Sequence, residues 1–212
     1  MLEVKQFTVN PVEENMYVVS DECGEAVIVD CGCMSESEWQ EVKEYIDGKS
    51  LKVRHLLNTH LHLDHCLGNR FAERDFGLKP KAAKEEFEFF TEINSGIFMP
   101  QLVASLKPAP PFSSIADGEQ IDFGNHTLEV IATPGHTLGG VCFYCKEENV
   151  LLSGDTLFAG SIGRTDLYGG DWDTLIASVK ERLMVLPEET KVYAGHGAAT
   201  TIEHERICNP YL

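Results

Sequence analysis

The sequence is poor in basic residues. Lys and Arg number 17 against 34 Asp and Glu in 212 residues, which gives a formal net charge of −17. A protein that binds nucleic acid or an anionic membrane needs a basic surface to meet the phosphates. The charge balance therefore argues against both partners, and we expect a small-molecule substrate. The oligomeric state stays open.

Long apolar runs are also missing. No stretch reaches the roughly 20 residues of a membrane-spanning helix, and Met1–Gln6 lacks the basic start and apolar block of a signal peptide. The seven cysteines are an odd number, which favours reduced thiols. We expect a cytoplasmic protein. We interpret the close pairs Cys31/Cys33 and Cys142/Cys145 as small buried apolar residues rather than metal or redox thiols.

The chain has neither low-complexity segments nor short repeats, and its hydrophobic content of 43% is typical of a globular core. We expect one domain, residues 1–212. Apolar runs bounded by turn residues predict strands at Glu3–Val9, Met16–Ser20, Glu25–Asp30, Val53–Asn58, Gln120–Phe123, Leu128–Thr133, Gly140–Cys145, Val150–Ser153 and Thr190–Ala194. Helical spacing predicts helices at Ser35–Ile46, Leu67–Phe76, Ala82–Phe90, Trp172–Leu186 and Thr200–Cys208. This order predicts an α/β fold of two similar halves, with their sheets face to face and helices outside.

Two features refine this prediction. Ser35 or Ser37 is expected to cap the first long helix, and Asp171 the helix after it in the second half. The segment Glu92–Ser114 holds four prolines and predicts an irregular connection. Its apolar residues must cover something, so Phe87–Leu102 is either a lid over a site or a cover for the core.

The most informative residues form the cluster His60-Leu61-His62-Leu63-Asp64-His65. Imidazole and carboxylate are ligands of zinc, iron, manganese and similar ions. A short peptide cannot aim all four side chains at one ion, because neighbouring residues point to opposite sides. The spacing instead predicts two adjacent ions, one bound by His60 and His62 and the other by Asp64 and His65.

Three further ligand-type residues share the context of this cluster. His136, Asp155 and His196 each follow an apolar strand directly, as Thr59-His60 does. Ligand sites in α/β sheets gather where strands end, so we expect these side chains to meet. Glycines beside Asp155 and His196 allow backbone conformations that other residues resist. The remaining histidines, His55, His126 and His204, have no such context and are predicted not to be ligands.

Taken in order, Thr59–His65, Gly135-His136, Gly154-Asp155 and Gly195-His196 resemble the metallo-β-lactamase superfamily of metallohydrolases over essentially the whole chain. The resemblance implies an αββα four-layer sandwich with two divalent metal ions. Zinc is the first expectation, and iron or manganese suits the same ligands. The resemblance assigns the ligands as follows: His60, His62 and His136 to one ion, Asp64, His65 and His196 to the other, and Asp155 to both.

Asp30 follows the strand Ala26–Val29 and matches the first acidic motif of the superfamily. We expect it to orient the His60 loop, because carboxylates behind metal ligands commonly fix histidine rings. An aspartate that ends a strand in a turn is the alternative interpretation.

Within the superfamily, Gly163–Asp166 and the ending Glu205–Leu212 look like the branch related to glyoxalase II. That branch cleaves thioesters such as hydroxyacyl-thiol esters with a metal-bridging hydroxide, and the resemblance implies Asp64 and Asp155 as catalytic residues. Glyoxalase II continues into a helical domain that binds glutathione, and this sequence stops at Leu212. The resemblance therefore carries over the metal chemistry, and whether glutathione is recognised stays open.

Three residues after Asp155 are candidates to line the site: Arg164, Asp166 and Tyr168. Arg164 and Asp166 also suit a purely structural ion pair. Tyr168 is the better candidate for substrate contact, since a tyrosine in this region meets the substrate in related thioesterases.

Other activities of the same fold fit less well. The better-known β-lactamases carry a cysteine near the position of Asp155. Sulfur dioxygenases would hold one iron at His60, His136 and Asp155, but they tend to have Asp-Tyr after the last histidine, where this chain has Gly197. A binding module without catalysis would be expected to lose ligands, and this set is complete.

Overall fold

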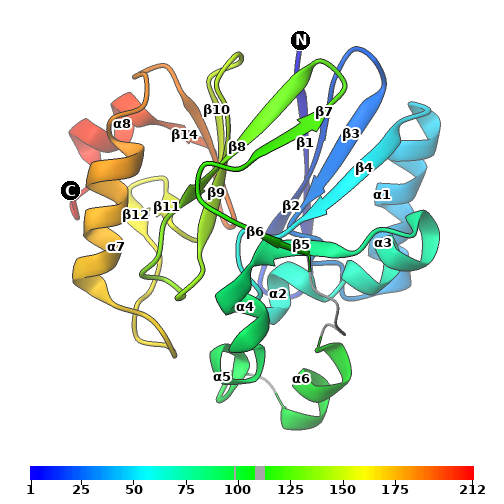
Figure 1. Ribbon diagram of the computed structural model, residues 1–212, viewed down its shortest axis with the longest axis horizontal. Coiled ribbons are helices and arrows are strands. Elements are labelled where there is room, and N and C mark those ends of the chain that lie inside the picture. Colours follow the sequence, from blue (N-terminus) through cyan, green and yellow to red (C-terminus); the bar gives the residue numbers. More distant parts are fainter. Residues whose placement is uncertain (98, 108–112) are drawn as a thin grey trace.

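The computed structural model describes residues 1–97, 99–107 and 113–212. Two six-stranded sheets lie face to face, and helices cover both outer faces (Figure 1). The first sheet holds β1 (Glu3–Val9), β2 (Glu14–Ser20), β3 (Glu25–Val29), β4 (Lys52–Leu57), β5 (Pro80–Ala83) and β6 (Ser113–Ile115) in chain order. The second holds β14 (Thr200–Thr201), β13 (Lys191–Ala194), β10 (Val150–Gly154), β9 (Val141–Cys145), β8 (His126–Ala132) and β7 (Gln120–Phe123). The predicted αββα sandwich is confirmed.

Strand direction explains where the polar loops gather. In the first sheet β3, β4, β5 and β6 run parallel, and in the second β10 and β13 run parallel. Parallel neighbours end at the same edge, so the loops that follow them meet there. Apolar side chains from both sheets, such as Val29, Leu57, Phe123 and Phe143, fill the space between them.

The outer layers are amphipathic helices. On the first sheet, α1 (Glu36–Gly48) and α3 (Asn69–Phe76) bury Trp39, Val42 and Phe71 against the sheet. On the second, α7 (Trp172–Ser178), a π-helical turn at Val179–Leu183 and α8 (Ile202–Cys208) bury Leu175, Leu183 and Ile202. Burying a large apolar side chain contributes about 1.5–3 kcal/mol to stability, so each layer is held mainly by its apolar face.

Three helix predictions need correction. The helix predicted over Thr200–Cys208 begins only at Ile202, because Thr200 and Thr201 pair with β13 as strand β14. The segment Ala82–Phe90 begins as the end of strand β5 and only then forms α4 (Lys84–Glu88) and α5 (Phe90–Asn94). Helix-favouring alanines are extended here because β5 pairs with both β4 and β6, and tertiary pairing overrides local propensity. The helix predicted over Trp172–Leu186 is regular only to Ser178 and then widens into the π-helical turn.

The predicted irregular connection Glu92–Ser114 also contains structure. It holds the end of α5, α6 (Pro100–Leu106) and the start of β6. Residues 98 and 108–112 of this segment lie outside the described residues. Phe87, Phe90 and Ile93 pack with Leu61 and Leu63 in one buried cluster, so the described part of Phe87–Leu102 covers the core beneath the His60 loop.

Short elements near the loops escaped prediction: α2 (Leu63–Cys66), β11 (Leu157–Phe158) and β12 (Ser161–Ile162). The caps are as expected. Ser35 accepts the Glu38 N–H in a capping box, and Asp171 caps α7.

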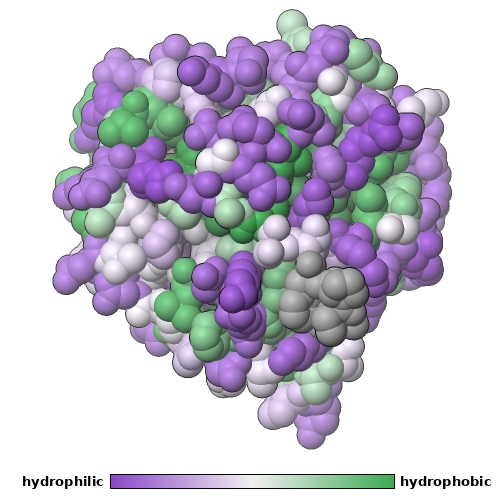
Figure 2. All heavy atoms as spheres, viewed as in Figure 1, coloured by the Kyte–Doolittle hydropathy of each residue, from purple (hydrophilic) through white to green (hydrophobic). Residues whose placement is uncertain are grey.

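The seven cysteines are free thiols, and Cys31, Cys33, Cys142 and Cys145 are buried, as predicted. Hydrophilic residues cover much of the face seen in Figure 2, with apolar residues showing in separate areas between them. Among the described residues, no helix combines the length and the apolar character needed to cross a membrane.

Candidate metal centre

Seven side chains converge where strands of the two sheets end. His60 follows β4, and His62, Asp64 and His65 lie in or just before α2. His136 follows β8, Asp155 follows β10 and His196 follows β13. The structure therefore brings together all the ligand candidates identified in the sequence. The first sheet supplies four of them and the second sheet three.

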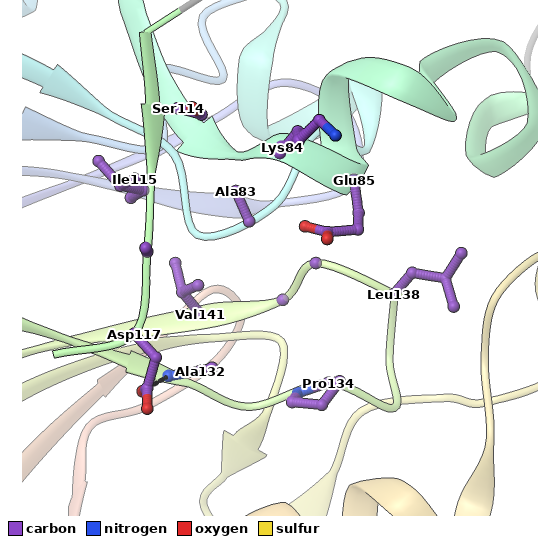
Figure 3. Close-up of a pocket in the computed structure, with 13 residues that line it drawn as sticks. Ala83, Lys84, Glu85, Ser114, Ile115, Asp117, Ala132, Pro134, Leu138 and Val141 are labelled. Carbon is purple, nitrogen blue, oxygen red and sulfur yellow. Dashed lines mark hydrogen bonds between the residues drawn. The ribbon is translucent and has the colours of Figure 1, made fainter. Parts of the chain in front are cut away.

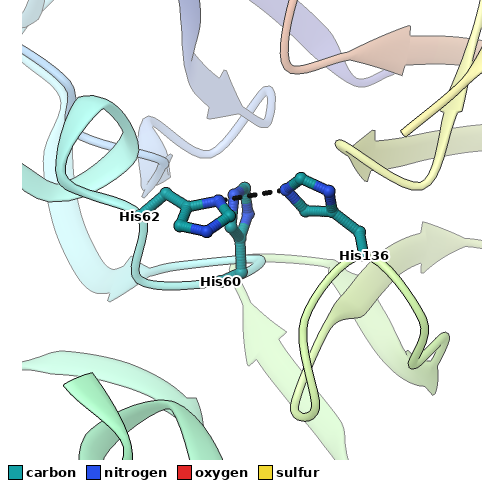
Figure 4. Close-up of side chains that lie close together, drawn as sticks. All are labelled: His60, His62 and His136. Carbon is teal, nitrogen blue, oxygen red and sulfur yellow. Dashed lines mark hydrogen bonds between the residues drawn. The ribbon is translucent and has the colours of Figure 1, made fainter. Parts of the chain in front are cut away.

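The first group consists of His60, His62 and His136, all at least nine-tenths buried. Their ring centroids lie 4.7–4.8 Å apart. Nδ1 of His62 is 3.0 Å from Nε2 of His136, and the three rings face one another across the space between the loops (Figure 4). Three imidazoles that meet in this way suit a single transition-metal ion.

The second group consists of Asp64, His65 and His196. Nε2 of His196 lies 3.3 Å from Oδ2 of Asp64, and Nε2 of His65 lies 3.6 Å from the same oxygen. Asp155 stands between the groups. Its Oδ1 is 3.4 Å from Nε2 of His65, and its Oδ2 is 3.7 Å from Nε2 of both His136 and His196.

The fit to metal ions can be judged from the polar atoms that have no partner. Nε2 of His60, Nε2 of His65 and Oδ1 of Asp155 are buried and make no hydrogen bond. An unpaired buried polar atom costs roughly 1–3 kcal/mol, and native proteins rarely leave several at one place. Metal coordination would satisfy these atoms, and the mixed imidazole and carboxylate set suits zinc, iron or manganese. The residues present thus fit two ions.

Hydrogen bonds behind the rings fix their orientation. Asp30 accepts the N–H and the hydroxyl of Thr59, both at 2.7 Å, and lies 3.2 Å from Nδ1 of His65. The Thr59 oxygen in turn lies 3.0 Å from Nδ1 of His60. With Nδ1 as the donor in both histidines, each Nε2 presents its lone pair to the site. One carboxylate therefore orients a ring in each group.

His136 is oriented by a backbone group instead. Its Nδ1 lies 2.8 Å from the carbonyl oxygen of Arg164. The guanidinium of Arg164 forms a two-pronged ion pair with Asp166, and both side chains are more than half exposed. Arg164 thus reaches the site through its main chain, while its side chain makes the structural pair. The half-exposed ring of Tyr168 lies 6.0 Å from the Phe89 ring.

Close backbone packing explains two of the glycines. Gly154 has φ +49°, and a Cβ there would lie 2.2 Å from the Thr59 hydroxyl. A Cβ on Gly195 would lie 2.2 Å from Oδ1 of Asp155. Asn15 holds the loop after Gly195, because its side-chain amide donates to the carbonyls of Ala194 and Gly197.

The two groups differ in electrostatics. Burial and the neighbouring histidines lower the pKa of His60 well below its usual value, and burial lowers the pKa of His62 to about 3. Burial opposes charge on His65 too, but Asp155 and Asp64 outweigh it and raise the pKa of His65 well above its usual value. The pKa of Asp155 is lowered despite its burial, mainly by His65. The first group thus favours neutral rings, and the carboxylates of the second group attract positive charge to the site.

Three polar residues of the site were missed in the sequence. Glu14 is fully buried with both oxygens unpaired, and its Oε1 lies 3.7 Å from Nδ1 of His65. Burial raises the pKa of Glu14 well above its usual value. Glu86 and Asn94 are buried beneath the His60 loop. Glu14 stands in a turn-like run and Glu86 in an acidic run, which are both typical of exposed segments. The one available signal is that Glu86 and Asn94 share a helical face with Phe90.

The other histidines lie apart from this centre. His126 starts β8, at the opposite end from His136, and pairs with Glu148 at 3.1 Å. With Asp21 and Glu22 it forms another group of ligand-type atoms. Nε2 of His55 faces the carbonyl of Asp122, and His204 is exposed.

A hollow of about 440 Å³ opens between the sheets beside the His136 loop. Ala83 and Ile115 line it from the first sheet, Val141 from the second and Leu138 from the loop after β8, with the Glu85 carboxylate at its edge (Figure 3). None of the seven ligand candidates lines it.

This chain is similar to several known proteins over its whole length. Hydroxyacylglutathione hydrolase GloC of Haemophilus influenzae is 33% identical over 215 residues, which span 100% of this chain and 98% of that protein. Two solved structures are each 33% identical. The B3 metallo-beta-lactamase BLEG-1 has a TM-score of 0.85 and covers 100% of this chain and 99% of its own. The di-iron-bound form of TTHA1623 has a TM-score of 0.82 and covers 99% and 100%.

The sequence profile of the Metallo-beta-lactamase superfamily matches residues 9–196. That span includes all seven candidate ligands, from His60 to His196. The chain therefore belongs to the metallo-β-lactamase superfamily, a family of metal-dependent hydrolases.

Proposed function

We propose that this protein is a dinuclear metal hydrolase that cleaves a thioester or related ester of a small molecule, in the manner of the glyoxalase II branch. The observation that carries the proposal is the position of Asp155. One of its oxygens faces His65 of the second group, and the other faces His136 of the first and His196 of the second. A carboxylate between two sets of imidazoles is the arrangement that lets two ions share one bridging ligand.

When bound, two such ions provide a hydroxide at neutral pH and stabilise negative charge on a carbonyl oxygen. The chain's own residues orient the reactants. Asp64 and Asp155 present carboxylate oxygens beside His196 and His65, where they accept a hydrogen bond from the attacking water and aim its lone pair. Attack of hydroxide on the carbonyl carbon would form a C–O bond as the C–S bond breaks. The proton of the hydroxide passes to the leaving thiolate, and the products are a carboxylate and a thiol.

The substrate class rests on similarity and on the site's surroundings. GloC, whose name describes a hydroxyacylglutathione hydrolase, matches this chain over its full length. We propose the Tyr168 ring, which lies beside the Phe89 ring, as the contact for an acyl or thiol group. The formal charge of −17 supports a small molecule over nucleic acid or a membrane surface. Zinc is the proposed metal, and the di-iron form of TTHA1623 makes iron the first competitor. We propose a cytoplasmic location on the basis of the reduced thiols.

A second candidate function is β-lactam hydrolysis, which the similarity to BLEG-1 favours. An aspartate at position 155 argues only against those β-lactamases that have a cysteine there. Both reactions add water to a carbonyl, so the leaving group distinguishes them: a thiolate in one and a ring amine in the other.

The test uses the purified protein with its native metal. A panel of hydroxyacyl thioesters, a chromogenic β-lactam and a glutathione persulfide are assayed side by side, the last by oxygen uptake. We expect kcat/KM for a thioester to exceed the β-lactam value at least 100-fold, without oxygen uptake. Faster β-lactam cleavage would favour the second function, and oxygen uptake with one iron per chain would replace hydrolysis with dioxygenation.

A further inference from the structure

We propose that Glu86 is a positioning residue that fixes the distance between the two loops of the first ligand group. This inference rests on the proposed metal site. The ligands of that group come from different sheets: His60 and His62 follow β4, and His136 follows β8. Small shifts between the sheets would separate the rings, so a direct link between the loops is needed to hold three nitrogens at one ion.

Glu86 supplies this link through its two carboxylate oxygens. Oε2 accepts the backbone N–H of Leu61 at 2.8 Å, and Oε1 accepts the backbone N–H of Gly139 at 3.0 Å. Leu61 lies between His60 and His62, and Gly139 lies three residues after His136. One rigid carboxylate thus bridges both loops.

The burial of Glu86 indicates that the link is specific. The residue is 1% exposed, and burial raises the pKa of its carboxyl group. Burying a carboxylate is unfavourable unless donors compensate for the lost water. The two N–H groups are such donors, and each would be a buried unpaired group without Glu86. Gly139 allows the close approach, because a Cβ there would lie 3.0 Å from Cγ of Glu86.

Asn94 holds the same loop from the next helix. Its Oδ1 accepts the Leu63 N–H at 2.9 Å, and its Nδ2 donates to the carbonyls of Leu61 and Phe90, both at 2.9 Å. The backbone on both sides of His62 is therefore fixed by side chains of α4 and α5. Asn94 contacts the His60 loop alone, whereas Glu86 contacts both loops.

Glu86→Gln tests the link with minimal change in shape. The amide keeps one oxygen acceptor but turns an N–H₂ donor toward the other backbone N–H, so one loop is released. Glu85→Gln is the matched control, since Glu85 is the exposed neighbour on the same helix. Each substitution is placed in two backgrounds. His196→Ala leaves the first group to hold the remaining ion, and His62→Ala leaves the second.

Zinc affinity is measured by chelator competition, with circular dichroism to check folding. We expect Glu86→Gln to weaken zinc binding 10–100-fold in the His196→Ala background and less than 3-fold in the His62→Ala background. Glu85→Gln should change neither. Equal loss in both backgrounds would show a general structural role and overturn the proposal, as would unchanged affinity in both.

Two further comparisons keep the outcome decisive. If Glu86→Gln does not fold, Glu86→Asp takes its place, because it keeps both acceptors on a shorter side chain. We expect this variant to lose zinc affinity, by less than the 10–100-fold given above, in the His196→Ala background only. Full affinity in that variant would contradict the link. The unsubstituted protein is titrated in parallel. If it binds fewer than two ions, the dinuclear function fails, and the effect of Glu86 on the ion that remains is still measured.

Discussion

At the scale of single residues, the account depends most on Asp155. Its carboxylate is buried, keeps one oxygen without a hydrogen bond, and lies between the two groups of imidazoles. Burial raises the pKa of Asp155, but nearby histidines, His65 most of all, lower it further than burial raises it. The carboxyl group therefore stays ionised across the physiological pH range. A charged bridging ligand requires this.

Asp155→Asn tests the bridge. The amide has nearly the same shape but no negative charge, and only one of its two ends can bind a cation. We expect metal content to fall below two ions per chain and kcat to fall at least 100-fold, with the circular dichroism spectrum unchanged. Elemental analysis and a thioester assay measure both effects. Unchanged turnover would refute the bridging role.

The sequence identified those residues whose side chain is a common metal ligand and whose position directly follows an apolar strand. His60, His136, Asp155 and His196 each stand just after an apolar strand, so the sequence alone indicated that they would meet. Glu14, Glu86 and Asn94 have no such marker. Glu86 and Asn94 are buried because α4 and α5 pack under the His60 loop, and Glu14 is buried because β2 begins beside His65. These are tertiary contacts, which local sequence does not encode.

At the scale of elements, the helices are set by their caps and by their apolar faces. In α1, the Ser35 oxygen accepts the Glu38 N–H, and the Glu38 carboxylate accepts the N–H of Ser35 at 2.9 Å. The sequence predicted a cap at Ser35 or Ser37, because capping depends on neighbours three residues apart, and the structure assigns it to Ser35. Strand β5 was not readable, because Pro80–Ala83 is extended only through its pairing with β4 and β6.

Ser35→Ala should therefore destabilise the protein without altering the site. Loss of an N-cap costs about 1 kcal/mol, and α1 lies outside the candidate metal centre. Urea unfolding should show this decrease in the free energy of unfolding, while metal content stays constant. Ser37→Ala, the alternative cap, should change stability by less than about 0.5 kcal/mol. Equal effects of the two substitutions would contradict the assignment of the cap.

A pH-dependent hydrogen bond joins α1 and α3. The Trp39 indole donates to Asp75 at 2.7 Å. Arg74 and then Trp39 lower the pKa of Asp75 to about 2. Because this pKa is lower in the folded state than in the unfolded chain, the bond adds stability above roughly pH 4. That stability is lost as the pH falls toward 2.

The indole N–H resonance of Trp39 reports this titration in NMR spectra. We expect its chemical shift to change with a midpoint near pH 2, and the change to disappear in Asp75→Asn. A midpoint near 4, the ordinary value for a free aspartate, would show that the ion pair and the indole bond do not form in solution.

At the scale of the whole molecule, the proposed metal ions would join two halves. Each ligand group draws on loops from both sheets, with His136 completing the first and His196 the second. The overall αββα architecture followed from the order of strands and helices. The precise alignment of the halves did not, because it depends on cross-sheet contacts such as those of Glu86 and Asn15.

Removal of the metals should consequently destabilise the entire fold. An ion present at 1,000 times its Kd adds about 4 kcal/mol to the stability of the state that binds it. For a protein of this size, that corresponds to a fall in Tm on the order of 10 °C. Calorimetry before and after chelation, then after zinc is restored, measures the change. An unaltered Tm after complete removal would show that the halves align without metal.

We propose that this chain holds two metal ions on seven ligands. The most direct test of this proposal is the number of transition-metal ions per chain, measured by elemental analysis of protein loaded with zinc and freed of unbound metal by gel filtration. We expect two ions per chain. One ion or none in the folded protein would contradict the proposal.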